Sequence, residues 1–138
     1  MCSGPERGVS VELPNLSTLL DKEIVIPVGV QGAADKGIFS YEFTLRYDPT
    51  VIQPLAEPVD VAKTVSRGLM VVANPYEPGL LRVVVYGAIP IDENGLLLNL
   101  RFTAVGKPGS VSPLTFERIM FNEGDPQVNA TGGMIELF

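Results

Sequence analysis

Two segments of this chain, 38–47 and 96–105, alternate apolar and polar side chains almost without interruption, and this pattern constrains the fold most. Successive side chains on a β-strand point to opposite sides, so a period of two is typical of a strand with one buried face. The expected inward side chains are Phe39, Tyr41, Phe43, Leu45 and Tyr47 in the first segment, and Leu96, Leu98, Leu100, Phe102 and Ala104 in the second. The alternation therefore predicts two strands that line the interior of two stacked sheets.

Shorter apolar segments fill the rest of the chain, and none has the period of an amphipathic helix of more than two turns. Fourteen glycines and twelve prolines separate them, as tight turns require. The remaining strands are expected at 9–13, 24–30, 51–55, 69–73, 80–87, 111–121 and 134–137. About nine short strands at this spacing predict an all-β, two-sheet sandwich. We place a flexible tail at residues 1–8 and a single domain at 9–138.

Three segments fit the pattern less well. Pro27 cannot donate a ladder hydrogen bond, so its strand is expected to lie at a sheet edge or to be broken there. Within the segment 57–68, residues 62–67 fit one helical turn ahead of a break at Gly68. A polar loop is expected over 122–133, before the last strand.

Composition and charge exclude several classes of partner. The chain has 16 acidic and 10 basic residues, a formal net charge of −6, and its basic residues are scattered. Nucleic acids and anionic membranes are bound mainly through clustered Lys and Arg, so neither is expected to bind. No apolar run approaches the roughly 20 residues that span a bilayer, and we expect no transmembrane segment.

The only cysteine is Cys2, which rules out an internal disulfide. Cys2-Ser3-Gly4 has the form of the lipid-modified start of a mature bacterial lipoprotein. A cloning remnant or a free thiol in the tail is the favoured interpretation of so short a motif.

The residues needed for most catalysis are absent from the sequence. There is no histidine, and the sole cysteine lies in the tail, so a histidine base, a cysteine nucleophile and a zinc cluster are not expected. The lysines fall in expected turns, where nothing lowers their pKa. We therefore expect no enzymatic activity and no cofactor. Weak calcium candidates are Asp92, Asn94, Glu123 and Asp125, but their spacing matches no calcium loop and solvated turns are favoured.

The outward sides of three expected strands are less polar than solubility requires. These outward residues are Glu42, Thr44 and Arg46, then Arg82, Val84 and Tyr86, and from 69–73 either Met70 and Val72 or Leu69 and Val71. Aromatic, Met and Arg side chains are enriched at protein interfaces, so this mixed set is a candidate binding patch. Coverage by loops, or ordinary scattered exposure, is the alternative.

Four stretches carry a resemblance to a known family. They are Ile24-Val-Ile-Pro-Val-Gly-Val30, Phe39 to Tyr47 closing on Tyr47-Asp48-Pro49, Gly95-Leu-Leu-Leu-Asn-Leu-Arg-Phe-Thr-Ala104, and Gly109 leading to Leu114-Thr-Phe116. In this order they resemble bacterial cohesin modules over nearly the whole chain from Val9. The resemblance implies a nine-stranded jelly-roll sandwich, extracellular or on the cell surface, that binds a dockerin module carrying any calcium itself. A role outside cellulosomes stays open.

The resemblance also implies a location for the binding site. In cohesins the partner docks on the sheet face that contains the third, fifth, sixth and eighth strands. By the order of elements, that face would hold Glu42, Thr44, Arg46, Met70, Arg82, Val84 and Tyr86. The residues of the patch and those of the implied docking face therefore coincide.

Two other functions stay open at this point. A carbohydrate-binding sandwich needs exposed planar aromatics, but the chain has no Trp and Tyr41 and Tyr47 are expected to be buried, which leaves Tyr76 and Tyr86. A structural or assembly domain of a larger extracellular protein would need no binding patch.

Overall fold

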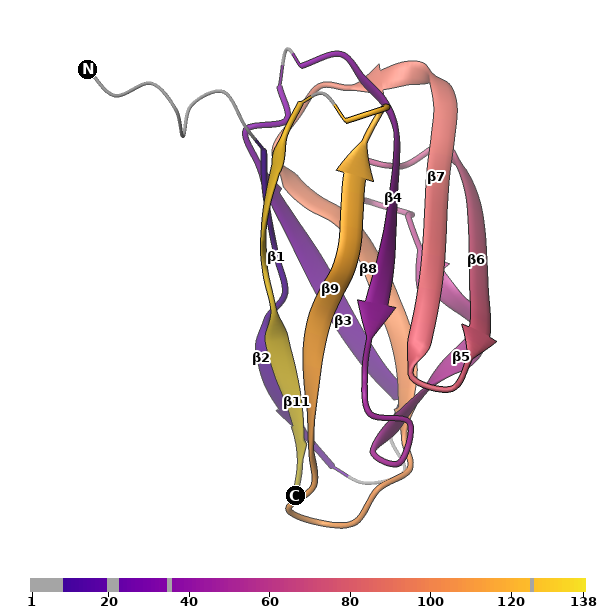
Figure 1. The fold of residues 1–138 in the computed structure, drawn as a ribbon, viewed down its shortest axis with the longest axis vertical. Coiled ribbons are helices and arrows are strands. Elements are labelled where there is room, and N and C mark those ends of the chain that lie inside the picture. Colours follow the sequence, from indigo (N-terminus) through magenta and orange to yellow (C-terminus); the bar gives the residue numbers. More distant parts are fainter. Residues whose placement is uncertain (1–8, 20–22, 35, 125) are drawn as a thin grey trace, which may run out of the picture.

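The computed structural model describes residues 9–19, 23–34, 36–124 and 126–138, which fold into two packed β-sheets (Figure 1). The five-stranded sheet has the order β10-β1-β3-β8-β5, and the six-stranded sheet has the order β2-β11-β9-β4-β7-β6. The strands are β1 (Val9–Glu12), β2 (Asn15–Thr18), β3 (Glu23–Gln31), β4 (Ile38–Arg46), β5 (Ile52–Asp60), β6 (Met70–Glu77), β7 (Leu80–Ile91), β8 (Gly95–Ala104), β9 (Val111–Phe121), β10 (Val128–Thr131) and β11 (Gly133–Leu137).

The expected all-β sandwich with jelly-roll topology is confirmed, with eleven strands in the described ranges in place of about nine. The tail expected at residues 1–8 lies outside those ranges. Among the described residues, no helix is long and apolar enough to cross a membrane.

The two additional strands arise because the first and last segments each divide between the sheets. The chain leaves β1, passes Leu13 and Pro14, and forms β2 on the opposite sheet. β10 lies within 122–133, so the prediction of a loop throughout that segment is wrong. β1 pairs with β10 in parallel, and β2 pairs with β11 in parallel. Strands this short and polar show no clear period, so pairing with a neighbour defines them.

Two glycines allow the chain to pass from β10 to β11. A Cβ atom at Gly133 would overlap the carbonyl oxygen of Pro14, and one at Gly132 would overlap the carbonyl oxygen of Leu114. The amide of Met134 donates to the same Pro14 oxygen at 3.2 Å, so the two crossing segments lie directly against each other. Glycine is required here because the backbones approach too closely for any side chain.

The core lies between the sheets and contains the inward sides of β4 and β8, as expected. Tyr41, Phe43 and Leu45 of β4 and Phe102 of β8 are almost fully buried. The ring of Tyr47 meets the ring of Phe102 edge-on, with centroids 5.1 Å apart. That contact ties the residue after β4 to the opposite sheet.

The alternation fails at the start of each of these two strands. Phe39 is 44% exposed and Leu96 is 39% exposed, so the prediction that both point inward is wrong. The β4–β7 register shifts at this point and Ile38 is buried in place of Phe39. The β3–β8 register shifts likewise and Leu97 is buried in place of Leu96. An irregularity of this kind moves a side chain to the opposite face of the sheet.

The segments that fitted the pattern less well have mixed outcomes. β3 pairs with β8 along its length but with β1 only over Gly29–Gln31, so Pro27 lies where β3 has a neighbour on one side only. The β3–β8 pairing is regular at Pro27 and shifts between Val28 and Gly29. Residues 61–68 form consecutive tight turns, so the expected helical turn is wrong. β6 and β7 form the expected hairpin, closed by Pro78 and by Gly79, whose φ is 90°.

We predict that Gly133→Ala lowers the free energy of unfolding by about 2 kcal/mol or more, because the added methyl overpacks the crossing against the Pro14 carbonyl. Chemical denaturation measures the loss. Gly29→Ala is the matched control, since a Cβ there meets only the flexible Glu12 side chain at 3.4 Å. Equal stability of the two variants would contradict the proposed role of the crossing.

Candidate functional site

The outer face of the six-stranded sheet brings all the residues of the predicted patch together. β4, β7 and β6 are neighbours, and side chains that pair across them fall into rows. The rows are Ser40, Tyr86 and Met70; then Glu42, Val84 and Val72; then Thr44, Arg82 and Asn74. Arg46 lies two residues further along β4. We refer to these residues, with Glu117, Arg118 and Met120 of β9, as the outer face.

One half of the outer face is apolar. Met70 is 60% exposed, Val72 52% and Tyr86 45%, which settles that Met70 and Val72, not Leu69 and Val71, are the exposed pair on β6. Val84 lies beside them and is half-buried. The inward sides of these strands fill the core, and this apolar group is left on the surface. An exposed contiguous apolar group of this kind is a candidate interaction site.

The other half of the outer face is charged. Arg46 Nε donates to Glu117 Oε2 at 2.7 Å, and Arg82 Nη2 lies 3.4 Å from Glu42 Oε2. The hydrogen bond from Arg46 lowers the pKa of the Glu117 carboxyl below its usual value, so this group is ionised at neutral pH. A shallow depression of about 690 Å³ opens between the strands here, lined by Glu42, Thr44, Asn74, Arg82, Glu117 and Arg118.

A bulge in β9 places two consecutive charged residues on this half. The β4–β9 register shifts between Thr44, opposite Arg118, and Leu45, opposite Phe116. Glu117 is therefore the extra residue, and both it and Arg118 are exposed. A regular strand would have turned one of them inward.

Sequence reasoning missed the contribution of β9 and part of β6. The residues it left out of the docking face are Ser40, Val72, Asn74, Glu117, Arg118 and Met120. One signal was present: Glu117 and Arg118 form a polar pair inside an otherwise alternating apolar segment, which is where a bulge is expected.

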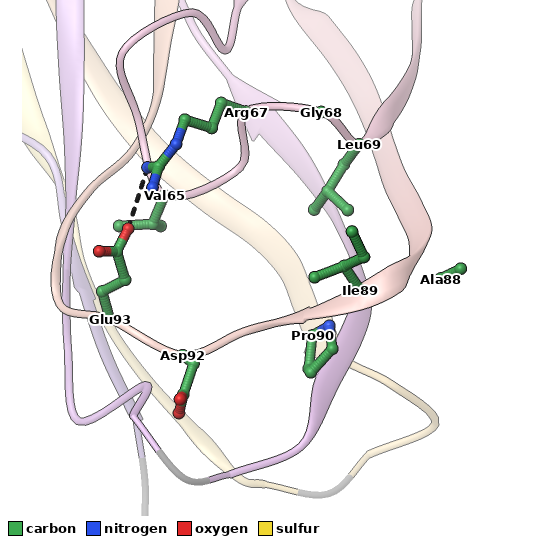
Figure 2. A pocket seen from close by; sticks show the side chains of 9 residues that line it. All are labelled: Val65, Arg67, Gly68, Leu69, Ala88, Ile89, Pro90, Asp92 and Glu93. Carbon is green, nitrogen blue, oxygen red and sulfur yellow. Dashed lines mark hydrogen bonds and ion pairs between the residues drawn. The ribbon is translucent and has the colours of Figure 1, made fainter.

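A second concavity of about 600 Å³ lies between the turns at 61–68 and the end of β7. Figure 2 shows Leu69 and Ile89 pointing toward each other and Arg67 bound to Glu93 across the opening, with 3.0 Å between Nη1 and Oε1. Asp92 points away from them (Figure 2). Both members of the ion pair are more than half exposed, so this pocket lacks the desolvated charged group typical of an active site.

A buried hydrogen bond holds the turns at 61–68 against the core. Tyr41 Oη lies 2.6 Å from Ser66 Oγ, while the Ser66 amide donates to Thr64 Oγ1 at 3.1 Å. Burial raises the pKa of the Tyr41 hydroxyl well above 10.0, although the hydrogen bond with Ser66 opposes part of that shift. The inward side of β4 therefore supports the rim of the pocket, while its outward side carries part of the outer face.

The calcium candidates do not come together among the residues that the structure describes, where no group of three or more His, Cys, Asp or Glu side chains lies close enough to hold a metal. Asn94 Oδ1 accepts a hydrogen bond from the Ala33 amide at 2.9 Å and so links the turn before β8 to the segment after β3. Asp92 and Glu123 are exposed, and Asp125 lies outside the described residues.

The aromatic platform that sugar binding requires is small. Tyr41 and Tyr47 are buried, as expected, and Tyr86 is exposed on the outer face. The side chain of Tyr76 lies outside the described part of the chain. Among the side chains that the structure describes, Tyr86 is the one exposed tyrosine, and a lone tyrosine ring on a mixed apolar and charged face suits protein contact better than sugar stacking.

Comparisons with known proteins agree on one family. A family profile described as "Cohesin domain" matches residues 9–134. The fold is similar to that of the sixth cohesin of scaffoldin B from Acetivibrio cellulolyticus, solved with the Cel5 dockerin, at 19% identity and a TM-score of 0.76, covering 95% of this chain and 99% of that one. It is similar to a non-cellulosomal cohesin from the archaeon Archaeoglobus fulgidus, at 19% identity and a TM-score of 0.76, covering 95% and 91%.

A third similar structure is the cohesin of OlpA from Clostridium thermocellum in complex with a dockerin. The identity is 17% and the TM-score 0.77, over 95% of this chain and 99% of that one. A search of curated protein sequences finds no match.

We predict that Ser66→Ala lowers the free energy of unfolding by about 2 kcal/mol, because the Tyr41 hydroxyl stays buried without a partner. The double variant Tyr41→Phe/Ser66→Ala removes both hydroxyls and is expected to recover part of that loss. Denaturant titration of Ser66→Ala, Tyr41→Phe and the double variant measures the coupling. Simple additivity of the two single losses would show that the hydrogen bond is not responsible.

The Tyr41 pKa gives the domain a stability that declines at high pH. In the unfolded chain the tyrosine ionises near 10.0, whereas the folded state keeps it neutral to higher pH. The unfolded state therefore releases its proton first, and the free energy of unfolding falls as the pH rises above about 10. Denaturant midpoints between pH 8 and 11.5 are expected to fall less steeply in Tyr41→Phe; identical slopes would count against this assignment.

Proposed function

The chain belongs to the cohesin domain family, and we propose that it is a non-catalytic recognition module that binds a dockerin-type protein through its outer face. The choice of this face rests on one observation. Met70, Val72 and Tyr86 form a contiguous exposed apolar group directly beside charged side chains on one sheet surface. An apolar centre with a polar rim is the composition of specific protein interfaces.

The size and chemistry of the outer face suit a protein partner. A specific interface needs about 800 Å² on each side, and one or two aromatic, Met or Arg anchors dominate its energy. Tyr86 lies between Met70 of β6 and Ser40 of β4, so its ring is in the middle of its row, with a neighbouring strand on each side. The known structures with bound dockerins, described above, support the same class of partner.

The solvent-exposed side of the five-stranded sheet is a weaker candidate for the docking surface. Val25 is 51% exposed there, but its cross-strand neighbour is Arg101, which is paired with Glu23 at 3.1 Å. An isolated exposed valine beside an ion pair is ordinary protein surface. The contrast between the two faces supports the assignment of docking to the six-stranded sheet.

The proposal extends to the setting in which the domain acts. Cohesins are binding modules without catalysis, and the absence of histidine from this chain is in keeping with that role. We place the domain outside the cell or on its surface, with calcium carried by the partner rather than by this chain. The Cys2 position that would anchor a lipoprotein lies outside the described residues.

We predict that Tyr86→Ala weakens dockerin binding by at least about fivefold, equivalent to about 1 kcal/mol, because it removes the central ring of the apolar row. The measurement is calorimetric titration of the domain with a panel of calcium-loaded dockerin modules, beginning with those encoded by its source organism.

Val25→Ala, on the other sheet, is the matched control and is expected to leave the affinity unchanged. Thermal melting of both variants checks that the fold is intact. If no dockerin in the panel binds the wild-type domain, the proposed function is wrong; if Tyr86→Ala binds as tightly as wild type, the proposed face is wrong.

A further inference from the structure

The charged half of the outer face differs in sign from the chain as a whole. Arg46, Arg82 and Arg118 stand there against Glu42 and Glu117, which leaves a formal charge of +1, whereas the chain carries −6. A local excess of positive charge on an acidic protein attracts a negatively charged group of a partner and repels a positively charged one.

The arginines differ in how far they are already engaged. Arg46 is bound to Glu117 at 2.7 Å, and Arg82 reaches Glu42 at 3.4 Å, near the long limit of a hydrogen bond. Arg118 is exposed and has no ion pair or hydrogen bond with the residues that the structure describes. It sits opposite Thr44 because the β9 bulge turns it outward.

The depression beside Arg118 is lined by donors and by two carboxylates. The donors are Arg82, Arg118, Asn74 and Thr44. The carboxylates are Glu42 and Glu117, and each is already paired with an arginine, Glu42 with Arg82 and Glu117 with Arg46. Arg82 lies between Asn74 and Thr44 in one row, and Arg118 continues that row across β4. Because the two glutamates are balanced by Arg82 and Arg46, Arg118 supplies the excess charge, and its guanidinium with the Asn74 amide and the Thr44 hydroxyl forms a donor set suited to a carboxylate, which accepts up to four hydrogen bonds.

From this arrangement we propose that the depression binds a carboxylate of the docking partner, an Asp or Glu side chain, and that Arg118 is its principal ligand. The inference rests on the proposed function, because it assigns partner chemistry to the same face. It makes Arg118 a specificity-determining residue: partners with an acidic side chain at this position bind, and those with Lys or Arg there are rejected.

The register fixes the spacing that the partner must match. Arg82 and Tyr86 are four residues apart on β7, or about 13 Å along the strand. A helix rises 1.5 Å per residue and repeats every 3.6 residues, so a partner helix that runs along the strands comes nearest to this spacing, on one side of the helix, about seven or eight positions from the residue that packs on Tyr86.

The neighbouring apolar rows favour a protein over a polyanion. Binding to a nucleic acid or a sulfated glycan needs many unpaired cations along a track, and here two of the arginines face glutamates. The exposed apolar side chains beside the depression are Met70, Val72 and Tyr86. A strongly hydrated polyanion would not bury their apolar surface.

A display library of dockerin variants tests the proposal directly. The library is a calcium-loaded dockerin scaffold whose docking helix is randomised among Asp, Glu, Lys, Arg, Ser and Leu. It is selected on three baits: the wild-type domain, Arg118→Glu, and Arg101→Glu as the control on the opposite sheet. We expect Asp or Glu to be enriched at one position about seven or eight residues from an apolar anchor on the wild type and on Arg101→Glu, and Lys or Arg at that position on Arg118→Glu.

The best wild-type binder is then titrated against each bait. Arg118→Glu is expected to weaken it by roughly tenfold or more and to reduce the salt dependence of its association rate. Replacement of its acidic residue with Lys is expected to restore binding to Arg118→Glu. Circular dichroism and thermal melting confirm that each bait is folded.

The outcomes separate the two proposals. If no clone binds the wild-type bait, the proposed function fails. If clones bind but show no acidic preference, or keep it on Arg118→Glu, the function stands and the carboxylate site is wrong. If dextran sulfate binds the wild type but not Arg118→Glu and displaces every selected clone, the site is a polyanion site, which also overturns the inference.

Discussion

The packing of one side of β4 between the sheets determines what its other side can do. Tyr41 and Phe43 are buried there, and their rings meet those of Phe121 and Phe116 at centroid distances of 5.6 and 5.4 Å. Side chains alternate strictly along a strand, so burial of these rings directs the residues between them to solvent. β4 pairs with β7 on one side and β9 on the other, and its register is therefore imposed on both neighbours. The outer face therefore consists of the residues of these strands that alternate with the core residues.

This link explains how much could be predicted from sequence. Apolar residues at every second position of β4 and β7 revealed the buried side, so the alternation alone indicated that Glu42, Thr44, Arg82 and Tyr86 point outward. That they share one face followed from the order of elements in the family that the sequence resembles. Period-two reasoning stops at irregularities. The bulge that turns Arg118 outward depends on the pairing of β9 with β4, which is non-local information. The same limit applies to β2 and β10, whose few residues become strands only because β11 and β1 are beside them.

Prolines restrict which parts of the surface are available for recognition. β5 and β6 are edge strands of their sheets, and an edge is normally open to pairing with another chain. Pro54 and Pro58 lie in β5, where the β5–β8 register also shifts, and Pro75 lies in β6 beside a shift of its own. Proline cannot donate a ladder hydrogen bond, so an added strand would pair poorly along either edge. Recognition through the sheet surface is thus favoured over recognition through the β5 and β6 edges.

The inward side of the six-stranded sheet contributes folding stability, whereas its outward side determines binding specificity. The inward residues are tightly packed, and changing their volume costs folding free energy. The outward residues are exposed, and their ion pairs are solvated, so they contribute little to folding. Substitution on the outer face can therefore change the shape and sign of the docking surface while the sandwich is retained. A module built in this way can acquire a new partner without a new fold, and its specificity resides in side chains such as Arg118 that the core does not need.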